Sequence, residues 1–318
     1  MRPSRTWTAA ALAFALAAGL AACSGDDESS EDPEYDAADC GPDASHLEGV
    51  EAPDAEFSAG DLKLEEKPER VVSISATVTE MLFAVDAGEQ VAAVDSTSNY
   101  PEEGLPEAEL DSFSPNVEAI VGYDPDLVVV SHDQDDILAS LESVGIPVYY
   151  APAALSLGDT YQQIVDLGSL TGNLEAAEDL TAQIDADITE MLDEMPVREE
   201  RLSAYYELDE ELFSLTSDTF AGSLLEMACF ENIADEADDA EETGGFPQLS
   251  GEFIISSDPD VIFASEESAD GVAERDGWDA VTAVAEDNVV ALDGDVSSRW
   301  GPRVVELMKA IVDAVANA

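Results

Sequence analysis

Two stretches of the chain carry the same phrase, and this phrase decides the fold. Residues Asn116–Val130 read NVEAIVGYDPDLVVV, and residues Ser250–Ala264, 134 positions later, read SGEFIISSDPDVIFA. In each phrase an apolar pair fits a helical turn packed on a sheet, and Asp-Pro-Asp ends the helix because the residue before a proline avoids the α region. The β-branched run that follows is typical of a buried strand. A helix-to-strand corner that recurs predicts an internal duplication.

The sequence around both phrases alternates between strand and helix patterns. RVVSIS, from Arg70, is a β-branched strand, and a helix is expected to begin at Thr77, where Thr77 and Glu80 fit a capping box. The strand patterns DLVVVS and PVYYAPA follow, and RLSAYYEL, DVIFAS and NVVALDG repeat the order later. Strands that alternate with helices predict parallel βαβ units. We therefore predict an α/β fold with two βαβ, Rossmann-like lobes.

A long helix is predicted between the two lobes. The pattern is helical from Asp159 and is interrupted once, at residues 171–173, where Asn173 fits an N-cap. Apolar residues then recur at spacings of three and four until Pro196, which gives a helix of about 30 Å at 1.5 Å per residue. Such a helix is long enough to cross between lobes. The predicted division is a signal peptide at 1–22, an acidic tether at 23–66 with a short ordered end near its close, an N-terminal lobe at 67–158, a helical segment at 159–196 and a C-terminal lobe at 197–318.

The first residues are predicted to be an export signal. Arg2 and Arg5 precede an uncharged apolar run over residues 9–22, which is shorter than the roughly 20 residues that a membrane span needs. The end of this run, LAAC, resembles the lipobox of bacterial lipoproteins, and the resemblance implies cleavage before Cys23 and a lipid on it. The alternative is an ordinary secretory signal cut near Ala22. Both place the mature protein outside the cytoplasm, and the lipid would anchor it to the outer face of the cytoplasmic membrane.

The remaining cysteines, Cys40 and Cys229, are even in number in an oxidising compartment. We expect a disulfide between them, which would tie the leader to the second half of the chain. The alternative is that Cys229 is buried as a small apolar side chain.

The charge balance excludes one class of partner. The chain has 73 Asp and Glu against 11 Lys and Arg, a net charge of −62. Nucleic acid is excluded because nothing basic is available to neutralise phosphates. So many like charges repel one another in dilute buffer, but at molar salt the Debye length falls to about 3 Å and the repulsion is screened. The composition therefore indicates a halophilic or salt-tolerant source.

Candidate ligand residues are those in loops that directly follow strands, because open α/β sheets bind ligands beyond the carboxyl ends of their strands. The loop SSRWGPR places Arg299 and Arg303 beside Trp300, so that an arginine would pair with the oxygens of an anionic chelate and the indole would form a wall. Alternatively, Arg303 caps the closing helix or pairs with a surface acid, and any single aromatic residue belongs to the core. The other candidates are Ser75, Thr77, Tyr100, Phe113, His132, Phe220 and Phe246.

Catalysis and a bare metal site are not indicated. His46 and His132 are the only histidines, too few for a transition-metal site with three or four nitrogen or sulfur ligands, although His132 as an axial ligand to haem or cobalamin stays open. The chain has no G-x-S-x-G, no Walker A and no G-x-G-x-x-G after a strand. We predict a protein that is not an enzyme, with no catalytic residue, resident metal or cofactor. A secreted hydrolase and an adhesive lipoprotein are the competing classes.

From about residue 68 to its C-terminus the chain resembles the metal-chelate substrate-binding proteins of ABC importers. The resemblance rests on the doubled Glu phrase on either side of a long helix, together with SNYPEE, SLLEMACFENIAD and SSRWGPR. It implies two lobes bridged by one long helix, with little hinge closure and with the ligand in the cleft between the lobes. The expected ligand is a ferric siderophore, with cobalamin or haem as alternatives.

The same resemblance implies a membrane partner. In that family one Glu from each lobe pairs with arginines of the permease, and by motif match these are Glu118 and Glu252. The alternative is that each Glu only stabilises the N-terminus of its short helix. The expected partners are a permease dimer with its ATPase and a small-molecule metal chelate, and the protein is expected to be a monomer.

Overall fold

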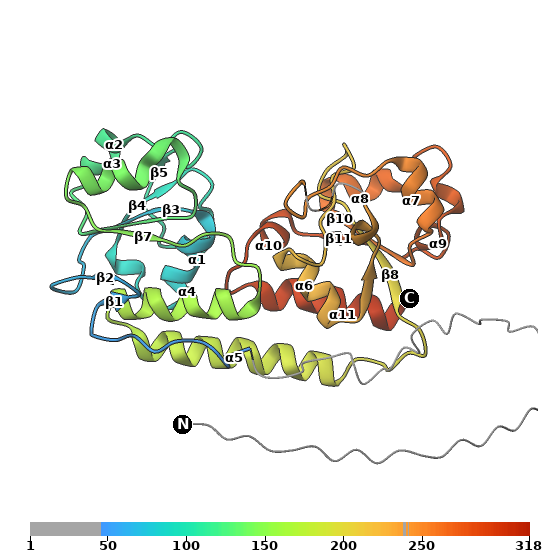
Figure 1. The fold of residues 1–318 in the computed structure, drawn as a ribbon, viewed down its shortest axis with the longest axis horizontal. Coiled ribbons are helices and arrows are strands. Elements are labelled where there is room, and N and C mark those ends of the chain that lie inside the picture. Colours follow the sequence, from blue (N-terminus) through green and yellow to red (C-terminus); the bar gives the residue numbers. More distant parts are fainter. Residues whose placement is uncertain (1–45, 238–239, 241) are drawn as a thin grey trace, which may run out of the picture. The chain divides into compact units, whose positions relative to one another are not determined.

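The computed structural model of the chain describes residues 46–237, 240 and 242–318, drawn in colour in Figure 1. The predicted signal peptide, the lipidation site Cys23 and the disulfide candidate Cys40 lie outside the described residues. None of the helices within these ranges is both long enough and apolar enough to cross a bilayer.

In the described part of the chain, the first sheet has five parallel strands in the order β5-β4-β3-β6-β7. We call this sheet and its helices the N-terminal lobe. Its strands are β3 (Val71–Ile74), β4 (Val91–Asp95), β5 (Ala108–Leu110), β6 (Leu127–Val130) and β7 (Val148–Tyr150). Its helices are α1 (Ala76–Ala84), η2 (Gly88–Gln90), α2 (Val117–Val121), η3 (Gln134–Asp136) and α3 (Ile137–Ser143).

The second sheet has the order β11-β10-β8-β9 and is also parallel. We call it, with its helices, the C-terminal lobe. Its strands are β8 (Leu202–Tyr206), β9 (Phe230–Asn232), β10 (Val261–Ser265) and β11 (Val289–Leu292). Its helices are α6 (Phe220–Met227), η4 (Ile233–Glu236), α7 (Gly251–Ser257), α8 (Glu266–Val272), η5 (Trp278–Ala280), α9 (Thr282–Ala285), α10 (Gly294–Ser298) and α11 (Val304–Asn317).

The two sheets share one winding, which confirms the predicted α/β duplication. In the N-terminal sheet β3 pairs with β4 on one side and with β6 on the other, and β7 lies beyond β6; in the C-terminal sheet β8 pairs in the same way with β9 and β10, and β11 lies beyond β10. The N-terminal lobe adds only β5 at its edge. The strands of the repeated phrase, β6 and β10, each lie between the first and the last strand of their lobe, so both phrases occupy the same place in the fold.

The apolar pair and the first Asp of each phrase also adopt equivalent conformations. Ile120 and Ile254 are fully buried against their sheets, whereas Val121, the second residue of the first pair, is exposed. Asp124 and Asp258 both adopt the left-handed conformation directly before the proline, with φ of 51° and 48°. Asp258 is the C-cap of α7, whereas α2 ends earlier, at Val121 with Gly122 as its C-cap.

The second Asp of each phrase ties its corner to the central strand of the sheet. Asp126 accepts hydrogen bonds from the backbone N–H groups of Glu69 and Arg70, each at 2.9 Å, at the start of β3. Asp260 accepts from the backbone N–H and the hydroxyl of Ser203 in β8, each at 2.8 Å. Asp-Pro-Asp is therefore structural in both lobes.

Two long helices follow the N-terminal lobe. These are α4 (Leu157–Leu170) and α5 (Leu174–Asp193), which lie side by side in Figure 1. The 20 residues of α5 pack against α4 and also against α11 of the C-terminal lobe, through buried residues that include Ile184 and Ile188. This agrees with the predicted bridging helix. Asn173 is the N-cap residue of α5, but its side chain makes no cap hydrogen bond.

Part of the predicted tether belongs to the folded body. Strands β1 (Ser58–Ala59) and β2 (Leu62–Lys63) form a small antiparallel hairpin. The Ser169 hydroxyl on α4 donates to the carbonyl of Ser58 at 2.7 Å, and the N–H of Glu51 donates to Gln162 at 2.6 Å. The sequence predicts a short ordered end of the tether, and the hairpin agrees with it. The contact of Glu51 with α4 shows that the ordered part begins earlier than the sequence predicts.

Removing the corner carboxylate should destabilise its lobe. In Asp260→Ala the N–H and hydroxyl of Ser203 lose an ionised acceptor, so we expect the free energy of unfolding to fall by about 2 kcal/mol. Asp270→Ala, an exposed substitution in the same lobe, is the control and should change it by less than about 0.5 kcal/mol. Urea unfolding of both variants at one salt concentration measures the difference, and equal stabilities would contradict the structural role.

Candidate functional site

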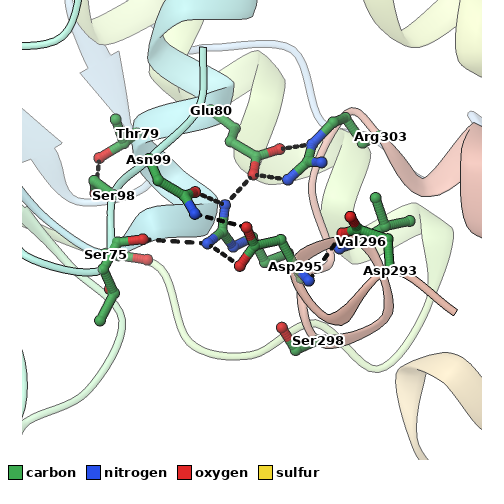
Figure 2. Close-up of polar contacts among 12 residues, drawn as sticks. Ser75, Thr79, Glu80, Ser98, Asn99, Asp293, Asp295, Val296, Ser298 and Arg303 are labelled. Atoms are coloured by element: carbon green, nitrogen blue, oxygen red, sulfur yellow. Dashed lines mark hydrogen bonds and ion pairs between the residues drawn. The ribbon is translucent and has the colours of Figure 1, made fainter. Parts of the chain in front are cut away.

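The carboxyl edge of the N-terminal sheet carries a buried hydroxyl network. Ser75 follows β3 and accepts a hydrogen bond at 2.7 Å from the hydroxyl of Ser131, which follows β6. Asp95, fully buried at the end of β4, accepts from Ser98 at 2.5 Å, and the hydroxyls of Ser98 and Thr79 lie 2.9 Å apart (Figure 2). These bonds fix the loops that leave three neighbouring strands.

The N-cap of helix α1 lies two residues before Thr77, the N-cap that the capping-box pattern predicts. Ser75 is the N-cap, and its hydroxyl accepts from the N–H of Val78 at 3.3 Å. Thr77 is a buried residue within the first turn. The predicted pairing of Thr77 with Glu80 is therefore wrong, and the Glu80 side chain is available for a different role.

Glu80 is the centre of an ion network that joins the lobes. Its side chain is 2% exposed and receives two arginines from the segment between α10 and α11 (Figure 2). Arg299 Nη1 donates to Oε1 at 2.6 Å. Arg303 approaches as a fork, with Nε donating to Oε2 at 2.9 Å and Nη2 to Oε1 at 2.7 Å. This hydrogen bonding raises the pKa of Arg303, so its guanidinium is charged at any physiological pH.

Arg299 has further partners on both sides of the network. Its terminal nitrogens also donate to Asn99 Oδ1 at 2.9 Å, to the carbonyl of Thr97 at 3.2 Å and to Asp295 Oδ1 at 2.6 Å. Asn99 in turn donates to Asp295 Oδ2 at 2.6 Å. Arg299 is only 8% exposed, so a ligand oxygen would have to replace one of these acceptors. Its predicted role as a ligand contact stays a prediction.

The other two residues of the SSRWGPR candidate set also face the N-terminal half of the chain. Trp300 Nε1 donates to Gln163 Oε1 at 3.0 Å, and its carbonyl accepts from Thr160 at 3.0 Å, both on α4. The Arg303 guanidinium carbon lies 4.4 Å from the centre of the Tyr100 ring. Arg303 therefore pairs with a buried acid and an aromatic face, and it does not cap α11 with its side chain.

The remaining aromatic candidates are solvent-accessible. Tyr100, Phe113 and Phe246 are 43%, 77% and 47% exposed, and Phe220 is half-buried. Phe246 lies in a segment held beside the loop after β8, because the N–H of Thr216 donates to the carbonyl of Gly245 at 2.9 Å. His132 is exposed directly after β6. The exposed rings thus come from loops of both lobes.

Sequence reasoning missed a second buried ion pair, at the carboxyl end of β8. Glu207 is fully buried and receives Arg275 as a fork, with nitrogen–oxygen distances of 2.5 and 2.7 Å. The Arg275 guanidinium also lies 4.6 Å from the centre of the Trp278 ring. The signal was present in the sequence, because Glu207 is the next-to-last residue of the strand pattern RLSAYYEL, near the position where ligand loops begin.

The arginines near these carboxyl edges are therefore compensated. Within the described ranges Arg275, Arg299 and Arg303 each pair with a buried carboxylate. The rest of the chain is strongly acidic. The same ranges contain no group of three or more His, Cys, Asp or Glu side chains that could hold a metal ion.

Glu118 and Glu252 occupy equivalent, exposed positions in the two lobes. The N-caps of their helices are Asn116 and Ser250, whose side chains accept from the N–H groups three residues on, at 3.0 and 3.1 Å. Capping is therefore done by other residues, although the helix N-terminus still favours a carboxylate there. Cys229 is disulfide-bonded, and because Cys40 lies outside the described residues its pairing with Cys229 stays a prediction.

A separate cavity of about 520 Å³ lies between β7, α4 and the β1–β2 hairpin. Asp166 on its wall accepts from Tyr149 at 2.9 Å and from Gln162 at 2.8 Å. Burial raises the pKa of Asp166, and these two hydrogen bonds partly oppose the effect. Both acceptor oxygens are used within the chain, so this carboxylate is explained by structure alone.

The chain is similar to known proteins along most of its length. A family model described as "Periplasmic binding protein" matches residues 71–296. A cobalamin-binding protein of Halobacterium salinarum is 31% identical, over 84% of this chain and 74% of the relative. An uncharacterized ABC transporter substrate-binding lipoprotein of Bacillus subtilis is 26% identical, over 80% and 82%. A Staphylococcus epidermidis structure, described as a possible iron-binding (periplasmic solute-binding) protein, has a TM-score of 0.69 and 26% identity, over 79% and 99%.

The buried Asp166 gives a pH-dependent prediction. Its raised pKa means that the folded state holds this proton more tightly than the unfolded chain, where an Asp has a pKa of about 3.9. As pH rises above about 3.9, the free energy of unfolding of the wild type therefore falls, because the unfolded chain releases this proton more readily than the folded protein does. A variant with an uncharged residue at position 166 does not show this fall. The stability difference between Asp166→Asn and the wild type should grow in favour of the variant and then level off. Urea unfolding from pH 4 upward measures it, and a difference independent of pH would contradict the assignment.

Proposed function

Because the chain belongs to the periplasmic binding protein family, we propose that it captures a metal chelate outside the cytoplasm and delivers it to the permease of an ABC importer. Membership of this family confirms the resemblance predicted from the sequence. It also makes the protein a binding component of transport rather than an enzyme, which removes the hydrolase and adhesive alternatives. The observation on which the proposed ligand class rests is the compensation of the arginines at the carboxyl edges.

The compensated arginines favour a neutral chelate. Haem carboxylates or an anionic siderophore would leave water for a site where Arg275 is paired with the buried Glu207, and where Arg299 and Arg303 share the buried Glu80, with the half-exposed Asp295 as a second carboxylate on Arg299. If no unpaired cation of the protein meets such an anion, its burial costs roughly several kcal/mol per charge, which is the usual effective cost of burying an ion in a protein. The remaining groups are exposed rings and amide or hydroxyl side chains, which suit a large apolar ring with amide arms.

We therefore place a cobalamin-type corrinoid ahead of the ferric siderophore that the sequence alone suggested. The 31% identical relative from Halobacterium salinarum, described as cobalamin-binding, supports this choice. A ferric siderophore is the second candidate, favoured by the side chain of Asp295: it is 42% exposed, so an anionic ligand would replace it on Arg299 with little rearrangement.

We propose that the protein functions at the membrane surface, at high salt concentration. The LAAC sequence before residue 24 supports a lipid on Cys23, as does the description of the Bacillus subtilis relative as a lipoprotein. The net charge of −62 supports function at molar salt, where like charges are screened. The protein would act as a monomer on a permease dimer with its ATPase.

Glu118 and Glu252 are the proposed contacts with the permease. Each is exposed at the start of a short helix whose other end is the corner tied to the central strand. The corner lies at the amino edge of the sheet, so each Glu points away from it, toward the edge where the ligand loops lie. Two carboxylates in equivalent positions fit a two-fold permease, where paired charges set register.

The ligand proposal predicts a ranking of affinities. In 2 M salt, titration of the protein with cyanocobalamin, haemin and ferric hydroxamate and catecholate siderophores, followed by tryptophan fluorescence and calorimetry, should give the tightest binding for cyanocobalamin. Phe246→Ala should weaken it about tenfold, which corresponds to about 1.4 kcal/mol, through loss of a ring contact. Val197→Ala, also exposed, is the control and should have no effect. Preferential binding of haemin or an anionic siderophore would contradict the neutral class.

The docking proposal predicts that transport and binding separate. Glu118→Lys with Glu252→Lys should abolish chelate uptake by cells or vesicles that carry the cognate permease, and should leave ligand affinity unchanged. Glu142→Lys with Glu267→Lys makes the same change of charge at exposed positions of the same two lobes and serves as the control. Normal uptake by the first pair, or the same loss in the control pair, would refute the assignment.

A further inference from the structure

We propose that Glu80 is a positioning residue: by holding the 299–303 segment of the C-terminal lobe against the N-terminal lobe, it makes a second link between the lobes beside α5 and fixes their separation. We call residues 299–303 the clamp. The evidence for the link is the set of contacts between the clamp and the N-terminal half of the chain. Its consequence for ligand binding rests on the proposed function.

The clamp is held by the N-terminal half of the chain at each of its polar residues. Arg299 and Arg303 bind Glu80 on α1, and Arg299 also binds the loop after β4 through Asn99 and the carbonyl of Thr97. Trp300 adds two hydrogen bonds to α4, which itself packs against α1. Even the glycine of the clamp is close, because a Cβ at Gly301 would lie 3.6 Å from both the Glu80 carboxylate and the Thr77 methyl.

The clamp is equally tied to its own lobe. Arg299 pairs with Asp295 on α10, and Asp293 caps that helix by accepting from the N–H groups of Asp295 and Val296 at 3.0 and 2.9 Å. Helix α11, which packs on α5 and β11, begins at Val304 directly after the clamp. A displacement of the C-terminal lobe would therefore be carried through α10 and α11 to the Glu80 contacts.

The charges explain why Glu80 carries the link. Its carboxylate is the acceptor for both arginines, and all three side chains are largely buried, so salt screens the pair much less than it screens the acidic surface. If Glu80 were neutral, two buried guanidinium groups would lie together without a central counter-charge, and they would favour a wider separation. Elsewhere both lobes are acidic and repel each other, so this network is a source of attraction between them.

Two links should restrict the lobes more than one. A single helix such as α5 still allows the lobes to bend and twist about its ends, whereas a second contact at a different place removes much of that freedom. The ligand loops, the ring of Tyr100 under Arg303 and the two docking glutamates would then be held at one spacing.

The test is a distance distribution between the lobes. Nitroxide labels at Ala139→Cys on α3 and Asp270→Cys on α8, both exposed, are placed in the full chain with Cys23→Ser, and pulsed electron paramagnetic resonance is recorded without ligand in 2 M salt. The parent should give one narrow distribution, and Glu80→Ala should give a broader one shifted to longer distance. Asp166→Asn, a change at a half-buried acid that bonds to Tyr149 within the N-terminal lobe, should leave it unchanged. A folded Glu80→Ala protein with the parent distribution would overturn the proposal.

Milder variants keep the proposal falsifiable if Glu80→Ala does not fold. Asn99→Ala combined with Trp300→Phe removes two clamp contacts and leaves all charges, and it should broaden the distribution to a smaller extent. An unchanged distribution in this double variant would also overturn the link. Because these measurements use no ligand, they hold even if the ligand proposal fails. In the presence of cyanocobalamin, Glu80→Ala should bind about tenfold more weakly, and unchanged affinity in a broadened protein would overturn the consequence for binding.

Discussion

The architecture depends on one repeated corner, in which an aspartate after a proline ties the strand that follows it, β6 or β10, to the first strand of its lobe. Asp126 and Asp260 place β6 beside β3 and β10 beside β8 in the same register relation. Because this fixes the order of the strands in both sheets, it also sets which loops lie together at the opposite edge. The helices before the corners, with Glu118 and Glu252, are positioned by the same bonds. The structural and the proposed functional parts of the phrase are thus physically coupled.

Local pattern was enough to predict much of this fold. The doubled phrase gave the duplication, and the spacing of apolar residues gave a helix that ends at Asp193, close to the predicted stop at Pro196. Sequence could not predict the role of Glu80, because a Glu three residues after Thr77 satisfies the capping pattern as well as it satisfies any other role. Its partner Arg299 lies 219 positions away, a distance over which no local rule operates. The packing of residues 46–66 on α4 was partly missed for the same reason.

Electrostatics links the composition to the choice of ligand. Of the few basic residues that this acidic chain has, three are committed to buried carboxylates at the carboxyl edges of its sheets. The sequence showed Arg299 and Arg303 clustered beside Trp300 and so suggested recognition of an anion. In the structure those charges pair with Glu80 and Asp295. This pairing is the reason why we propose a neutral chelate rather than an anionic one.

The central claim is that a neutral chelate is held by the carboxyl-edge loops of both lobes at once. Hydrogen–deuterium exchange of the full chain in 2 M salt, with and without saturating cyanocobalamin, tests it most directly. The account predicts slower exchange in residues 96–101 and 131–134 of the N-terminal lobe and in residues 214–220 and 245–249 of the C-terminal lobe, with the Asp126 and Asp260 corners unchanged. Protection confined to one lobe, protection only around the cavity beside Asp166, or no protection at all would contradict it.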